Sequence, residues 1–422
     1  MRDMQAAPGG LRRGSRRRAP GIAASSRWAR WFSGLGLAIA VVGCSSAVAT
    51  HSLASTSAPG VTPGRSETSP KPTVAPLPKP TGRSGTFTAT APTNLPAQGP
   101  AEPALLKNGK VLVVGEGAAV LYDPITGQFR STGVPAPNPG DSDFPGMGFE
   151  PNGNETLLLG DGRVLTLGTW DAEVYDPSTG GFSLAGPETS SHDGGAVVLL
   201  LDGRVLAIGG SVDDVAEFSG AKVDIYDPTT GKFTRTGSMK TGRDSFTATR
   251  VRDGRVLVAG GETQDTDAGQ VYSSAEIYDP ATGKWSLTGS MTTPRDEATA
   301  TLLDNGKVLV TGGEDDDGNI LASAELYDPT TGKFTKTGSM SIARSRQTAA
   351  LLRDGRVLIA GGSTADDPTD TAEIYDPSLG TFSQTGSMTV ARWIPSAVTL
   401  PDSSVLVVGS ADTPISADLY WP

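Results

Sequence analysis

The chain of 422 residues contains one cysteine and two histidines. A single cysteine, Cys44, excludes a disulfide within one chain, so the fold must be stable without one. Because His51 and His192 are its only imidazoles, the ligands that copper and catalytic zinc sites favour are nearly absent. The Gly-x-Ser-x-Gly motif of serine hydrolases is also missing, as is a glycine-rich phosphate loop that leads into a helix. The sequence therefore predicts no catalytic residue.

Basic residues are scarce outside the N-terminal region. The formal net charge is −11, although residues 1–43 contain eight Arg and one acidic residue, so the remainder of the chain carries −18. Such an acidic chain argues against nucleic acid or anionic lipid as a direct partner of its folded part.

Seven copies of one pattern fill the C-terminal part of the chain. Each copy has a short turn, and a later strand ends in Tyr-Asp-Pro or, in the last copy, in Tyr-Trp-Pro. The turns are Asn108-Gly109, Asp161-Gly162, Asp202-Gly203, Asp253-Gly254, Asn305-Gly306, Asp354-Gly355 and Asp402-Ser403. Successive prolines of the closing phrase lie 45 to 53 residues apart. A period near 50 residues that is built only from strands predicts a seven-bladed β-propeller with one blade per repeat.

The sixth repeat predicts four antiparallel strands per blade. Residues 347–352 and 356–360 are apolar runs on either side of Asp354-Gly355, a pair that favours a type I′ hairpin turn. Residues 371–375 form the third expected strand, and residues 382–385 form the fourth after a proline turn.

The N-terminal end of the repeat region predicts how the ring closes. An aromatic residue follows each of the first six prolines by five positions, but the chain ends before a seventh can occur. Residues 85–88 resemble this fourth strand, with Phe87 in the aromatic position. We therefore expect an N-terminal strand to complete the last blade, so that residues 85–422 form one propeller without open sheet edges at its seam.

The first 84 residues predict export and tethering. An arginine-rich region precedes a short apolar stretch that ends in Val41-Val42-Gly43-Cys44, which resembles the lipobox of bacterial lipoproteins. We expect residues 1–44 to be a signal peptide with Cys44 as the lipidated residue; an uncleaved signal anchor or an ordinary signal peptide is the alternative. Residues 45–84 are rich in Ser, Thr, Pro and Ala and predict a disordered tether. The propeller would then be extracytoplasmic and lipid-anchored to the bacterial cell membrane.

The repeat itself resembles the Kelch repeat. The pattern is Asp-Gly-Arg-Val-Leu-x-x-Gly-Gly, then Glu-x-Tyr-Asp-Pro, then an aromatic residue, and it is closest to the propeller domain of galactose oxidase and its bacterial relatives. Kelch propellers serve as enzymes, sugar-binding modules and protein-interaction platforms, so the resemblance implies the fold more than the function. Galactose oxidase would imply a copper site with two His, two Tyr and a Tyr–Cys cross-link, which this inventory cannot supply.

One face of the predicted ring varies in loop length and carries the candidate ligand residues. The loops between second and third strands differ in length and share this face with the connections between blades, so we expect function there. Five cations stand eleven residues before the second turn position of their repeat and could bind an anionic sugar or a carboxylate: His192, Arg243, Arg295, Arg344 and Arg392. In the alternative interpretation, each pairs with a carboxylate that stands two residues before the Tyr, namely Glu173, Asp224, Glu276, Glu325, Glu373 or Asp418.

Two further features depart from the repeat. Trp170 and Trp393 could stack on sugar rings, although burial is the commoner fate of a tryptophan. The loop residues Asp315, Asp317 and Asn319 could hold calcium through hard oxygen ligands, and a solvated acidic loop is the alternative.

These observations favour a non-catalytic, monomeric module that binds a protein or a cell-surface glycan through the variable face, with no nucleic acid partner. The alternative from another class is a metal-independent carbohydrate-active enzyme of the lyase or epimerase type, with His192 as acid or base.

Overall fold

The computed structural model describes residues 84–95, 101–115, 117–135, 156–167, 172–189, 192, 195–210, 220–263, 269–365, 367–409 and 415–422. These residues form strands and turns, and they include no helix long and apolar enough to cross a membrane. Cys44, the expected signal peptide and most of the expected tether lie outside the described residues, so they stay predictions.

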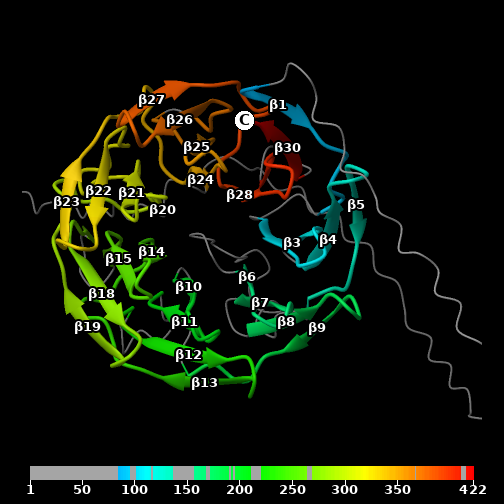
Figure 1. Cartoon of the computed structure of the whole chain (residues 1–422), viewed down its shortest axis with the longest axis horizontal. Coiled ribbons are helices and arrows are strands. Elements are labelled where there is room, and N and C mark those ends of the chain that lie inside the picture. The colour runs from blue at the N-terminus through cyan, green and yellow to red at the C-terminus, as the bar shows by residue number, and fades with distance from the viewer. Residues whose placement is uncertain are drawn as a thin grey trace, which may run out of the picture. The chain divides into compact units, whose positions relative to one another are not determined.

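Seven antiparallel sheets of four strands stand around a central axis, which confirms the predicted seven-bladed β-propeller (Figure 1). The first strand of each blade lies nearest the axis and the fourth lies at the rim. Blade 1 consists of β2 (Glu102–Leu105), β3 (Val111–Gly115), β4 (Ala118–Asp123) and β5 (Gln128–Ser131). Blade 2 consists of β6 (Thr156–Leu158), β7 (Val164–Leu167), β8 (Ala172–Asp176) and β9 (Gly181–Leu184). Blade 3 consists of β10 (Ala196–Leu199), β11 (Val205–Ile208), β12 (Val223–Asp227) and β13 (Lys232–Arg235).

The remaining blades repeat this order. Blade 4 consists of β14 (Thr247–Arg250), β15 (Val256–Ala259), β18 (Ala275–Asp279) and β19 (Lys284–Leu287). Its second-to-third loop carries a small extra hairpin, β16 (Glu262–Thr263) and β17 (Gln270–Val271). Blade 5 consists of β20 (Thr299–Leu302), β21 (Val308–Thr311), β22 (Ala324–Asp328) and β23 (Lys333–Lys336), and blade 6 of β24 (Thr348–Leu351), β25 (Val357–Ala360), β26 (Ala372–Asp376) and β27 (Thr381–Gln384). Blade 7 consists of β28 (Pro395–Thr399), β29 (Val405–Gly409), β30 (Ser416–Trp421) and β1 (Thr86–Ala89).

The ring closes as the sequence predicts. The N-terminal strand β1 pairs antiparallel with β30, with Phe87 opposite Tyr420. Their ring centroids lie 4.9 Å apart, against 4.8 to 5.1 Å for the corresponding pairs of the six other blades. The Gly85 N–H also donates to the Trp421 carbonyl at 2.7 Å. Phe87 is therefore the seventh member of the aromatic series, and the first strand of the propeller belongs to its last blade.

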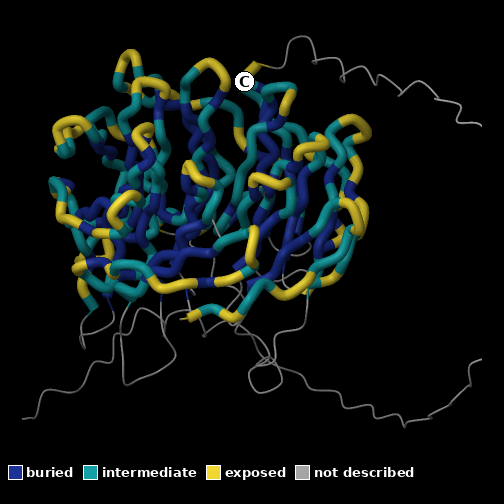
Figure 2. Tube along the Cα trace, turned by 60° about the horizontal axis from the view of Figure 1, so that its bottom comes forward, coloured by how far each residue is buried: buried dark blue, intermediate teal, exposed yellow. Residues whose placement is uncertain are grey.

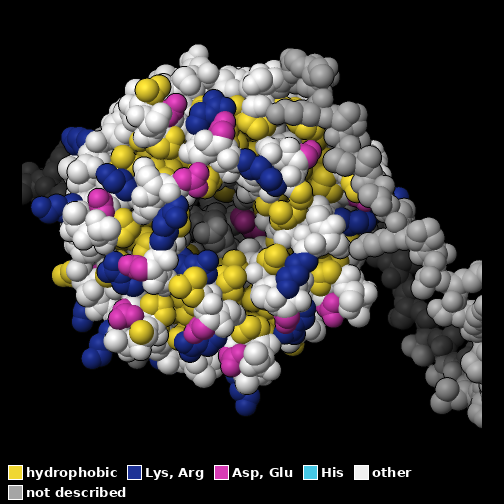
Figure 3. All heavy atoms as spheres, in the orientation of Figure 1, with side chains coloured by type: hydrophobic (Ala, Val, Ile, Leu, Met, Phe, Trp, Pro, Cys, Tyr) yellow, Lys and Arg dark blue, Asp and Glu magenta, His cyan; other side chains and the backbone are white. Residues whose placement is uncertain are grey.

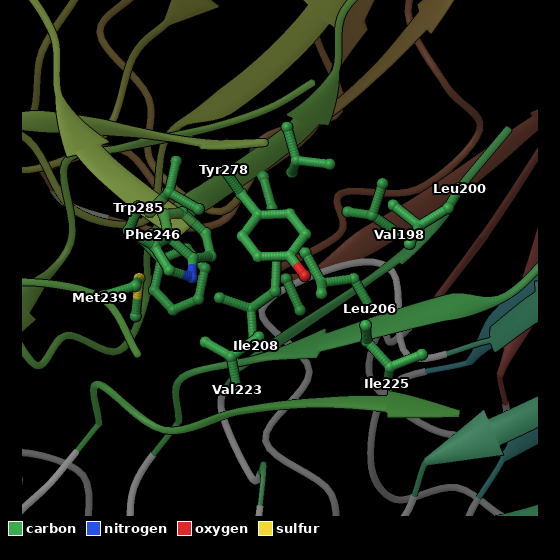
Figure 4. Close-up of a cluster of buried hydrophobic side chains, with 14 residues drawn as sticks. Val198, Leu200, Leu206, Ile208, Val223, Ile225, Met239, Phe246, Tyr278 and Trp285 are labelled. Atoms are coloured by element: carbon green, nitrogen blue, oxygen red, sulfur yellow. The ribbon is translucent and has the colours of Figure 1, made fainter. Parts of the chain in front are cut away.

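The core lies between neighbouring sheets, because the second strand of each blade is buried on both faces. Strands β7, β11, β15, β21 and β25 are buried along their whole length. Figure 4 shows one such layer, in which Leu206 and Ile208 of blade 3 face Phe246, Tyr278 and Trp285 of blade 4. Exposed residues, in contrast, gather in the turns at the ends of the strands (Figure 2).

The inner hairpin turns differ from the prediction. A type I′ turn needs positive φ at both central residues, but in Asn108-Gly109 only the glycine has it, at 83°. The Gly109 N–H donates to the Leu106 carbonyl at 2.9 Å, and the Leu106 N–H donates to the Lys110 carbonyl at 2.8 Å. This is a three-residue loop with a type I turn and a left-handed residue after it, so the type I′ prediction is wrong. In blade 7 the left-handed position is taken by Ser403, at φ 79°.

Candidate functional site

The face that carries the hairpin turns repeats one ion pair in four of its seven blades. Four turns hold an Arg against the Asp two residues earlier at 2.7 Å, in the pairs Arg163–Asp161, Arg204–Asp202, Arg255–Asp253 and Arg356–Asp354. In the view of Figure 3, basic and acidic side chains likewise lie next to each other around a central opening. The same exposed pair thus recurs in four of the seven blades, and an exposed pair of this kind contributes little binding energy.

The four predicted ligand arginines are buried. Arg344 represents them: Nη1 donates to the carbonyls of Gly361 and Thr371, both at 3.0 Å, and Nη2 donates to Thr371 Oγ1 at 3.1 Å and to Glu373 Oε1 at 3.4 Å. Arg243, Arg295 and Arg392 bind the equivalent carbonyls and Glu276, Glu325 and Asp418. None of the four side chains is measurably exposed. Burial lowers the pKa of Arg344 from its usual value, and Glu373 opposes that shift.

The carboxylates of these pairs hold the connections between blades. The two oxygens of Glu373 accept hydrogen bonds from the backbone N–H groups of Ser341 and Ile342 at 2.9 to 3.2 Å. Glu276 and Glu325 accept equivalent bonds from the two residues that stand two and three positions before their Arg. Each Arg–carboxylate pair thus fastens the segment that enters a blade to the second and third strands of that blade.

His192 takes the place of the arginine in blade 3. Its Nδ1 lies 2.9 Å from the Gly209 carbonyl and its Nε2 lies 3.2 Å from Asp224, with 1% of the side chain exposed. Asp224 also accepts a hydrogen bond from Thr189 and forms an ion pair with Arg235, whose Nε lies 2.8 Å from its Oδ1. Burial alone would raise the pKa of Asp224, but the hydrogen bonds from His192 and Thr189 hold it well below its usual value. His192 is therefore enclosed in a structural contact and not presented to a substrate.

The five residues predicted to bind an anionic ligand all lie in these buried contacts. His192, Arg243, Arg295, Arg344 and Arg392 form buried pairs with carboxylates, which is the alternative that the sequence left open. The physical reason is the cost of burying a charge without a counterion, which each of these blades avoids with its own Asp or Glu.

The other predicted ligand residues are not assembled into a site by the described residues. Trp393 is half-buried beside Arg392, and Trp170 lies outside the described residues. Asp315 Oδ1 accepts the N–H groups of Asp317 and Asn319 at 3.0 and 2.9 Å, and the Asn319 side-chain amide donates to it at 3.1 Å. Over the part of the chain that the structure describes, no group of three or more His, Cys, Asp or Glu could hold a metal ion. Calcium binding by Asp315, Asp317 and Asn319 stays a prediction.

A set of residues that sequence reasoning missed lies where the chain enters the innermost strands. Ser245, Glu297 and Arg346 each stand two residues after a buried Arg, with φ of 51°, 49° and 56°. The Glu297 N–H donates to the Ser245 carbonyl at 2.9 Å, and the Arg346 N–H donates to the Glu297 carbonyl at 3.0 Å. The side chains of Arg346 and Glu297 form an ion pair, with 22% and 12% of each exposed. We call these three residues the entry ring.

The three residues of the entry ring share a backbone conformation but differ in side-chain type. Non-glycine residues adopt positive φ rarely, so three in equivalent positions show that the fold imposes this conformation. Yet the side chains are a hydroxyl, a carboxylate and a guanidinium. The signal in the sequence was the second position after each repeated Arg, which differs in every repeat.

Comparison with known proteins agrees with this architecture. The family model of the Kelch motif matches residues 245–292, 299–341 and 344–389, which cover blades 4 to 6. An F-box/kelch-repeat protein of Arabidopsis thaliana is 34% identical over 120 residues, a match that spans 28% of this chain and only 31% of the relative's length. A fungal alcohol oxidase of the AA5 family, solved in complex with copper, superposes with a TM-score of 0.63 at 18% identity, over 81% of this chain and 76% of the oxidase. That likeness shows the fold alone. The chain is thus a seven-bladed β-propeller that carries Kelch motifs in three consecutive blades.

Proposed function

We propose that the protein is a non-catalytic binding module, an extracytoplasmic propeller on a lipid-anchored tether, which recognises a protein partner through its variable face. The observation that carries this proposal is the entry ring, where one backbone position presents Ser245, Glu297 and Arg346 in consecutive blades. Positions that serve only the fold repeat their residue type, as the buried arginines do. Positions that serve recognition are free to differ.

The partner should carry a basic surface. Beside the entry ring, residues 314–320 of blade 5 form a short hairpin with Glu314 bridged to Ile320, and we call this segment the acidic hairpin. Asp316 on its tip accepts the Val271 N–H at 2.8 Å, so blade 4 fixes the hairpin in place. Asp317 next to it is exposed. Like charges across an interface cost several kcal/mol, so this surface selects against acidic partners and favours cationic ones.

The enzymatic alternative has no supporting observation among the described residues. It relied on His192 as acid or base, and that ring is held between a backbone carbonyl and Asp224. A glycan remains the second kind of ligand that the assay below would detect.

The test is affinity capture of cell-surface proteins with the full chain, followed by cross-linking and quantitative binding, with a glycan array run in parallel. Charge reversal in the acidic hairpin, Asp317→Lys, should weaken binding of the captured protein at least tenfold. Asp304→Lys makes the same charge change on an exposed residue of the turn face and is the matched control. If Asp304→Lys weakens binding and Asp317→Lys does not, the variable face is not the binding surface. Glycan binding without protein binding would replace the proposed partner class.

A further inference from the structure

One buried carboxyl of the propeller stands apart from the Arg–carboxylate pairs. Glu102 begins β2, the innermost strand of blade 1, and is 9% exposed. Its Oε1 accepts a 2.9 Å hydrogen bond from Ser396 Oγ on β28, the innermost strand of blade 7. Glu102 therefore bridges the first blade and the last one.

The contact lies at the junction where the ring is closed. Residues of blade 1 and blade 7 share one apolar cluster that includes Val111 and Val113 on one side and Leu406 and Val408 on the other. We call this contact between blades 7 and 1 the seam. Blade 7 is also the blade completed by β1, so the seam adjoins the closing strand.

Among the described residues, the strands packed against Glu102 carry no charged side chain. Strand β2 contacts β3, β6, β28 and β29. These strands read VLVVG, TLL, PSAVT and VLVVG and contain no titratable side chain. A buried carboxylate without a counterion is costly, and the group avoids that cost by keeping its proton.

The fold does not require an acid at this position. In the register of the inner hairpins, Glu102 lies opposite the last residue before the strand-ending glycine or glycine pair. Thr247, Thr299, Thr348 and Ser396 take the same place in blades 4 to 7, and Ala196 takes it in blade 3. A hydroxyl or a methyl group is sufficient in these five blades, so packing alone does not need the Glu at the seam. The corresponding residue of blade 2 is Glu155, which lies outside the described residues.

We propose that protonation of Glu102 controls the seam, which stays closed while the carboxyl is neutral and opens more readily once it is ionised. Opening the seam returns Glu102 to water, where the carboxylate is well solvated. The ionised form thus favours the open seam, and the neutral form favours the closed one. This inference is independent of the proposed partner.

The direction and size of the effect follow from burial. Desolvation raises the pKa of Glu102 from 4.5 to about 7, and the hydrogen bond from Ser396 opposes the shift. Because the folded-state pKa is the higher one, the seam is most stable below pH 4.5, and that stability is lost as the pH rises towards 7. A shift of this size raises the opening constant on the order of 50-fold between pH 5 and pH 8.

Hydrogen exchange of the full chain, measured by mass spectrometry from pH 5 to pH 8 and corrected for intrinsic exchange, tests the proposal. Peptides that cover β1, β28 and β30 should lose protection as the pH rises, whereas peptides from blades 4 and 5 should not. Glu102→Gln mimics the neutral carboxyl and should abolish the dependence. Ser396→Ala removes the hydrogen bond that opposes the shift, so it should move the transition to higher pH. Asp253→Asn, which alters an exposed ion-paired carboxylate in blade 4, should behave as the wild type.

Glu102→Thr gives a second variant, with the residue that three other blades use, in case the Gln amide packs poorly. Seam protection that is constant with pH in the wild type would overturn the proposal. A pH dependence that persists in both Glu102 variants, or that is equal in all blades, would overturn it as well.

Discussion

Removing one carboxylate from a buried pair tests whether the repeated arginines belong to the framework. Glu325→Gln leaves the Arg295 guanidinium buried without a counterion, in a pair whose side chains are 0% and 1% exposed. Breaking such a pair costs about 3–5 kcal/mol. The loss is large beside the roughly 5–15 kcal/mol by which a typical protein is stable. Thr292 and Thr293 also lose a charged acceptor for their N–H groups, which adds to the loss.

The assay is urea unfolding of the full chain, with the free energy of unfolding compared among variants. Asp253→Asn is the control, because it removes the carboxylate of an exposed pair whose side chains are 36% and 51% accessible. An exposed pair contributes about 0–1 kcal/mol, so this variant should hardly differ from the wild type. The double variant Arg295→Met with Glu325→Leu removes both charges and should recover most of the lost stability.

A loss of stability in Glu325→Gln that is no larger than in Asp253→Asn would refute the buried ion pair. That result would mean that Arg295 reaches water or another anion, and a ligand role for the repeated cations would return. A double variant no more stable than Glu325→Gln alone would also contradict the pairing.

Three further predictions concern single positions of the ring. Phe87→Ala should lower the free energy of unfolding by about 3 kcal/mol, because it removes the ring that packs on Tyr420; a loss confined to a few tenths would contradict closure by β1. Ser403→Gly should add about 0.5–1 kcal/mol in urea unfolding, since it relieves a non-glycine residue at φ 79°. An unchanged midpoint there would show that the turn stores no strain. Ala185→Thr should stabilise the protein by about 1 kcal/mol, because the new hydroxyl can bond the hydroxyl of Tyr226 in the next blade. In five other blades, a Thr at the equivalent position lies 2.8 to 3.0 Å from the equivalent Tyr hydroxyl. The equivalent change to Val, which cannot form the bond, is its control.

The sequence was sufficient to predict the propeller, because residues that recur at the same position of every repeat serve the same structural purpose in every blade. The aromatic residue five positions after each proline identified Phe87 as the missing seventh member, and the observed pairing with Tyr420 confirms it. The turn type was less accessible, since an Asp-Gly pair suits a two-residue type I′ loop and also a three-residue loop whose last residue is left-handed. Only the hydrogen-bond register distinguishes the two.

The site was harder to predict for a related reason. Spacing correctly offered a carboxylate partner for each repeated Arg, but it could not decide between that partner and a ligand, because burial depends on the neighbouring strands. The entry ring escaped notice because Ser245, Glu297 and Arg346 share a conformation and not a residue type. Glu102 was missed because its meaning depends on Ser396, which lies 294 residues away in the sequence.

Placing the first strand in the last blade also determines the order of events during biosynthesis. Thr88 and Trp421, whose side chains share a 3.1 Å hydrogen bond, are separated by 333 residues. At about 5–20 residues per second, β1 leaves the ribosome roughly 20 s to a minute before its partner strand is made. During that interval the nascent chain holds an unpaired strand at each end of an incomplete circle, and no truncated product can complete it. A finished propeller therefore requires translation of β30, and a product that stops between β1 and β30 keeps an unpaired strand edge that can pair with other chains.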